Sequence, residues 1–169
     1  MTIMGTDDIM LTGHFKLSEF TASATARAKG IDNTPGAEQI ENLRNLCENV
    51  LEPLRQHIRT PLVISSGYRC PRLNRLVGGV PDSQHQTGEA ADIRVPKTCI
   101  GQSDGRPHTD RRIGRGWMEW IVSQCTFDQC IWETADGLDY WIHVSCRRDH
   151  GLNRQQVISH LQKRQASNK

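Results

Sequence analysis

The sequence lacks long apolar runs, is poor in aromatic residues, and has almost balanced charges. No stretch of its 169 residues reaches the 18 or more apolar residues of a membrane span, and aromatic residues make up 5% of the chain. The formal net charge is only +2, from 21 basic and 19 acidic residues. A nucleic-acid-binding protein is usually far more basic. We therefore expect no membrane span and no nucleic-acid partner, and a monomer with one hydrophobic core.

Paired cysteine motifs and a secretory signal are also missing. None of the six cysteines forms a C-x-x-C pair, which argues against a zinc ribbon and a thioredoxin-like redox site. The N-terminal residues, MTIMGTDDIMLTGHF, do not combine a basic region with an apolar run, as a signal peptide does. A chain that stays in a reducing cytoplasm would keep these cysteines reduced, and we expect free cysteines.

Changes in composition divide the chain into three parts. We expect residues 1–14 to be an irregular lead-in, residues 15–150 to form the main domain, and residues 151–169 to form a C-terminal helix and a frayed tail. Helix-like and strand-like segments follow one another without internal repeats. This order predicts an α+β fold with a small antiparallel sheet and helices packed on one side of it.

Helical periodicity is strongest between residues 35 and 58, where apolar residues recur every three or four positions. Thr34 is the expected cap of this helix, and Pro53 is expected to kink or break it. Further helices are predicted within residues 17–30 and 116–125.

Four short segments are rich in β-branched and aromatic residues and predict strands. They are residues 61–66, 90–95, 127–133 and 139–145. The last two are separated by TADGL, whose Asp-Gly pair is typical of a hairpin turn. The polar, glycine-rich residues 67–89 between the first two predict a long functional loop, and residues 101–112 predict a second polar loop.

The segment SQHQTGEAAD, at residues 83–92, places a histidine and an aspartate seven residues apart. Asp92 falls on the second predicted strand and His85 on the loop before it, and Gly88 permits a turn that directs both into one cleft. A catalytic zinc site needs three nitrogen or oxygen ligands and an open fourth position. The best third candidate is His143, in the middle of an apolar strand. Alone, His143 fits a buried core histidine better; with His85 and Asp92 it predicts a single zinc-binding cleft.

Four segments of the chain match one known pattern. They are S-x-H-x-x-G-x-A-x-D at residues 83–92, the preceding SGYR and LNRLVGG, and the following WIHVS. Together they resemble the zinc D-Ala-D-Ala carboxypeptidase family of peptidoglycan peptidases, which share a fold type with the hedgehog signalling domain. The resemblance extends over about residues 15–147, and His85, Asp92 and His143 match the ligands of Zn²⁺.

This resemblance implies a zinc metallopeptidase that hydrolyses D-amino-acid-containing bonds in the stems or cross-links of bacterial peptidoglycan. A phage endolysin is the kind of member that suits a chain without a signal peptide, and it would stay in the cytoplasm until lysis releases it, or be associated with a virion, and act at the cell wall. Arg69, in SGYR, matches an arginine that holds a substrate carboxylate or carbonyl oxygen, although a structural salt bridge is the alternative. Ser83 matches a substrate-binding position, and capping its own loop is an equal alternative.

The general base is not fixed by the resemblance. Family members usually carry an acidic residue three positions before the last histidine, but Tyr140 stands there in this chain. The candidates are Glu133 and Asp139, which would face each other if TADGL formed the hairpin loop. We prefer Glu133, because a carboxylate at the end of an apolar strand is costly and needs an explanation.

The missing acid leaves a second class of function open. A non-catalytic module that retains the zinc site, for binding or as part of a virion, would also match the ligand pattern. Zinc binding with hydrolysis would favour the peptidase, and zinc binding without it the non-catalytic module.

Overall fold

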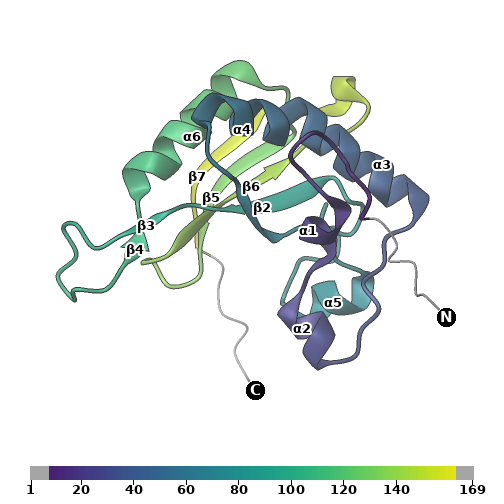
Figure 1. Cartoon of the computed structure of the whole chain (residues 1–169), viewed down its shortest axis with the longest axis horizontal. Coiled ribbons are helices and arrows are strands. Elements are labelled where there is room, and N and C mark those ends of the chain that lie inside the picture. Colours follow the sequence, from purple (N-terminus) through teal and green to yellow (C-terminus); the bar gives the residue numbers. More distant parts are fainter. Residues whose placement is uncertain (1–7, 163–169) are drawn as a thin grey trace.

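A mixed five-stranded sheet in the order β1-β2-β6-β5-β7 is the centre of the fold (Figure 1). The computed structural model describes residues 8–162, so that residues 1–7 of the expected lead-in and 163–169 of the expected tail lie outside the described residues. The strands of this sheet are β1 (Val63–Ser66), β2 (Ala90–Arg94), β5 (Gln129–Thr134), β6 (Tyr140–Ser145) and β7 (Gln156–Gln162). A separate two-stranded arm consists of β3 (Lys97–Thr98) and β4 (His108–Thr109).

The α+β class is confirmed, and all four predicted strands are present as β1, β2, β5 and β6. The expected antiparallel sheet is corrected to a mixed one, since β7 runs parallel to β5 while the other neighbours are antiparallel. The helices are α1 (Leu17–Thr21), α2 (Ala24–Ala28), α3 (Ala37–Leu46), α4 (Glu52–Ile58), α5 (Pro71–Leu76) and α6 (Arg111–Gln124). A π-helical turn (Cys47–Leu51) and a 3₁₀ turn (His150–Leu152) complete the described helical segments.

The predicted long helix is present as α3, the π-helical turn and α4. The wider π turn comes directly before Pro53, which is consistent with the expected break, because proline cannot donate a helical hydrogen bond and clashes with the preceding turn. The expected cap at Thr34 is wrong. The main-chain nitrogen of Thr34 donates to Asp32 Oδ1 (2.9 Å) in a separate turn, and the helix begins after Gly36.

The predicted C-terminal helix is also wrong, since β7 occupies that part of the chain. The carboxylate of Asp128 accepts hydrogen bonds from the main chain and the guanidinium of Arg154, and the main chain of Asp128 accepts from Gln156. These contacts lead the chain along the edge of β5. There Val157 and Ile158 pair with β5, a position that suits β-branched residues.

Two further segments differ from the prediction. The loop expected at residues 67–89 contains the short helix α5, with Pro71 at its first position, where a missing N–H costs nothing. The second polar loop contains β4, which pairs with β3 in the arm that projects from the sheet (Figure 1). Among residues 8–162, no helix is both long and apolar enough to cross a membrane.

The two faces of the sheet differ because successive side chains of a strand point to opposite sides. Helices α3, α4 and α6 lie across one face (Figure 1), and strand residues of that face join the hydrophobic core. They are Ala91, Ile93, Tyr140, Ile142, Val144, Cys130 and Trp132. The alternate positions, including Asp92 and His143, therefore point to the face that these three helices leave uncovered.

Candidate metal centre

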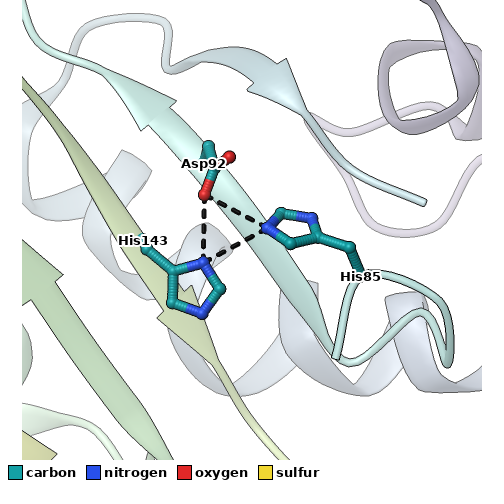
Figure 2. Close-up of side chains that lie close together, drawn as sticks. All are labelled: His85, Asp92 and His143. Atoms are coloured by element: carbon teal, nitrogen blue, oxygen red, sulfur yellow. Dashed lines mark hydrogen bonds and ion pairs between the residues drawn. The ribbon is translucent and has the colours of Figure 1, made fainter. Parts of the chain in front are cut away.

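His85, Asp92 and His143 converge on one point of that uncovered face (Figure 2). Asp92 on β2 is the direct register partner of His143 on β6, so both side chains project side by side. His85 Nε2 lies 3.2 Å from Asp92 Oδ1 and 3.2 Å from His143 Nδ1, and His143 Nδ1 lies 3.0 Å from Asp92 Oδ1. All three residues are buried.

The loop before β2 directs His85 toward the two strands because it packs closely on α3. Gly88 has a φ of +76°, and a Cβ there would lie 2.5 Å from the carbonyl oxygen of Gln39. Only glycine satisfies both conditions without strain. One residue earlier, the carbonyl of Thr87 accepts a hydrogen bond from Asn42 Nδ2 (2.7 Å). The expected role of Gly88 thus has a structural basis in this close packing.

A main-chain carbonyl fixes the ring of His85. His85 Nδ1 lies 2.7 Å from the carbonyl oxygen of Gly67, so Nδ1 carries the hydrogen and donates it. Burial lowers the pKa of His85, although the charge of Asp92 opposes this effect. In the neutral ring that burial favours, Nε2 therefore presents a lone pair to the other two residues.

The three donor atoms fit a metal ion. Burial alone raises the pKa of Asp92, but its interactions with His85 and His143 bring the pKa well below its ordinary value. A carboxylate oxygen and an imidazole lone pair thus face each other at 3.2 Å, and a cation between them would satisfy both. Two ligands of a tetrahedral zinc ion at 2.0–2.1 Å are about 3.3 Å apart. Two nitrogens and one oxygen at 3.0–3.2 Å therefore match the spacing of three ligands around one tetrahedral metal ion.

Arg69 and Ser83 lie together beside the ligands. The main-chain nitrogen of Arg69 donates to the carbonyl of His85 (3.0 Å), and its Nη2 donates to Ser83 Oγ (3.4 Å). Ser83 Oγ also accepts from the main-chain nitrogen of His85 (3.4 Å), so it caps its own loop as well. Burial lowers the pKa of Arg69, while the carboxylates of Asp92 and Glu133 act in the opposite direction.

Glu133 lies on the same face as the metal ligands. On β5, Ile131 pairs with His143 and Glu133 pairs with Trp141, so Glu133 is one diagonal step from His143. Its side chain is buried, with 3% of the residue exposed. This position is compatible with contact to a substrate held at the metal centre.

Asp139 lies elsewhere, at the arm formed by β3 and β4. Its carboxylate accepts hydrogen bonds from Lys97 Nζ (2.6 Å) and from the main-chain nitrogen of Thr109 (3.2 Å). Glu133 and Asp139 do not face each other as expected, because Thr134 extends β5 and pairs with Tyr140. Thr134 Oγ1 donates to the carbonyl of Asp139 (2.7 Å), which fixes this register.

Sequence reasoning missed two residues that position the site. Asn33 donates to the carbonyl of Tyr68 (3.0 Å) and accepts from the main-chain nitrogen of Cys70 (2.8 Å), so it holds the chain on both sides of Arg69. A Cβ on Gly67 would lie 2.5 Å from the carbonyl oxygen of Phe20. An asparagine in a turn-forming stretch gives no signal that it is buried, whereas Gly67 was visible within SGYR.

The fold and the buried centre define an α+β protein whose sheet brings together two histidines and one aspartate that could hold a metal ion. A family model described as peptidase M15 matches residues 13–104, which include His85 and Asp92. Because the match covers more than half of the chain, the protein belongs to the peptidase M15 family. His143 lies beyond the matched residues, and the pairing of β2 with β6 brings it to the other two. Comparison with curated proteins finds no match.

Proposed function

We propose that this protein is a zinc metallopeptidase that hydrolyses peptide bonds in the stems or cross-links of bacterial peptidoglycan. The observation that carries the proposal is the convergence of three ligand atoms from His85, Asp92 and His143 in a member of a peptidase family. The choice of D-amino-acid-containing substrates rests on the resemblance of the surrounding motifs. An endolysin-like setting, in which the enzyme reaches the wall through lysis or on a virion, belongs to the same proposal.

The three ligands would hold zinc and leave an open position toward the substrate. Zinc bound in such a site supplies Lewis acidity, which lowers the pKa of water to about 7 and polarises the scissile carbonyl. Glu133 accepts the proton of the attacking water and returns it to the leaving amine nitrogen. The guanidinium of Arg69 holds a substrate oxygen through its unused N–H groups.

The lack of an acid at Tyr140 does not weaken this mechanism. The ring of Tyr140 stacks on Trp132 with centroids 5.0 Å apart, and both residues belong to the core under the helices. Position 140 therefore points away from the metal centre in this chain. A carboxylate there would require a different strand geometry to reach the substrate.

Mass spectrometry of fragments released from purified peptidoglycan tests the proposal. The zinc-loaded protein should release new stem fragments, whose masses identify the bond that is cut, and Asp92→Ala should release none. Zinc content is measured for both proteins. If the parent binds zinc but releases nothing from several types of wall, the non-catalytic zinc module becomes the better explanation.

A further inference from the structure

A second feature of the uncovered face is a cavity of about 400 Å³ beside the metal centre, between α2, α5 and the edge strand β1. Three arginines line it: Arg27 of α2, Arg94 of β2, and Arg69 in the segment between β1 and α5. Its other polar lining residues include Ser65, Ser66 and Tyr68. No acidic residue is among the residues of the described chain that line it. The cavity therefore combines three positive charges with no negative one.

This cavity adjoins the metal ligands. Arg94 is two residues after Asp92 on β2, so both side chains leave the same face of the strand. Ser66 on β1 is the register partner of Asp92. Arg69 joins the two regions, since it lines the cavity and its main chain is hydrogen-bonded to His85. The cavity and the three ligand residues thus have Arg69 as a common neighbour.

The three guanidinium groups have unused binding capacity. Within residues 8–162, none of Arg27, Arg69 and Arg94 forms an ion pair. Arg69 is only 8% exposed, and its Nε has no hydrogen-bond partner among the described residues. The Arg69 side chain donates to the neutral Ser83 Oγ and forms no ion pair, and a guanidinium fork matches the two oxygens of a carboxylate. An anionic ligand would therefore use N–H groups that are still free, such as Nε.

We infer that this cavity is a carboxylate subsite, in which Arg27 and Arg94 act with Arg69 to select peptides that carry an acidic residue near the scissile bond. The inference rests on the proposed function, because it takes the occupant to be part of the peptide substrate. Arg27 and Arg94 are specificity-determining residues here, and neither acts on the reacting atoms. Both residues are exposed and line the cavity, so a side chain that enters it from solvent would meet them.

Matched peptides test the subsite. The probes are acetylated tetrapeptides of D-alanine in which one position at a time carries D-glutamate or its uncharged isostere D-glutamine. Cleavage is followed with the zinc-loaded parent, and binding is measured by calorimetry with zinc-loaded Glu133→Gln. At one position the glutamate peptide should be preferred by about tenfold or more, the usual effect of a charged hydrogen bond. Arg27→Gln and Arg94→Gln together should abolish the preference.

Arg75→Gln is the matched control, since it removes an exposed positive charge from α5 outside the cavity and should keep the preference. Equal binding of each glutamate and glutamine pair, or a full preference in the double variant, would overturn the subsite. A preference in binding without any hydrolysis would retain the subsite and count against the peptidase. Hydrolysis without a preference would support the peptidase and overturn the subsite.

Discussion

Replacing Glu133 with glutamine keeps the size of the side chain on β5 but removes its ability to accept a proton. A general base usually contributes 10²–10⁴ in rate, so kcat should fall by about that factor, equivalent to roughly 3–5 kcal/mol in the activation barrier. Zinc content should not change, because Glu133 is not among the three converging ligands. The assay is the initial rate of peptide release at equal zinc loading, with the melting temperature measured beside it.

Asp139→Asn is the matched comparison, since it makes the same chemical change in the other candidate base. Its carboxylate is 38% exposed and pairs with Lys97, so its loss should alter the free energy of unfolding by at most about 1 kcal/mol. We expect kcat to stay within about twofold of the parent, because this carboxylate contacts the arm and not the metal centre. If Asp139→Asn abolished hydrolysis while Glu133→Gln did not, the assignment from strand register would be wrong.

Three further predictions concern the metal, the loop and the sheet edge. Zinc at 100 times its Kd should stabilise the parent by about 2.7 kcal/mol and raise its melting temperature. Thermal melts with zinc and with a chelator measure this difference, and the melting temperature of Asp92→Ala should hardly differ between the two conditions. Gly88→Ala should lower both zinc affinity and stability, because its Cβ would collide with the Gln39 carbonyl; unchanged zinc titrations would contradict this. Burial raises the pKa of Asp128, but hydrogen bonds from Arg154 lower it from 3.8 to about 2. The resulting contribution of about 2 kcal/mol should be complete above about pH 4 and lost as the pH falls toward 2. Asp128→Asn should remove it, and equal acid unfolding curves for parent and variant would refute the pairing.

The convergence of His85, Asp92 and His143 was predictable because the information lies in short segments. His85, Gly88 and Asp92 stand within eight residues of one another, and the polar His143 interrupts an apolar strand. Once the two strands pair, alternation alone brings the Asp92 and His143 side chains to one face. The position of Glu133 was harder to predict from the sequence, because a one-residue change in the hairpin register decides which residue Glu133 faces.

Other parts of the molecule depend on contacts between distant segments. The C-terminal segment has a thin apolar stripe that fits either a helix or a strand, and the contacts of Asp128 select the strand. The arginines of the cavity stand at positions 27, 69 and 94, far apart in sequence, and only the packing of α2 against the edge of the sheet brings them together. Local patterns hold no signal for such groupings.

The three converging residues and the residues that line the cavity are held in place by different contacts. Asp92 and His143 stand on paired strands, whose other face is fixed by the hydrophobic core. The loop ligand His85 is held by the carbonyl of Gly67 and by close packing at Gly88. The residues that line the adjacent cavity come instead from α2, α5 and exposed positions of β1 and β2. Substitutions there can change which side chain is accepted without moving a ligand, because the ligand positions depend on other contacts.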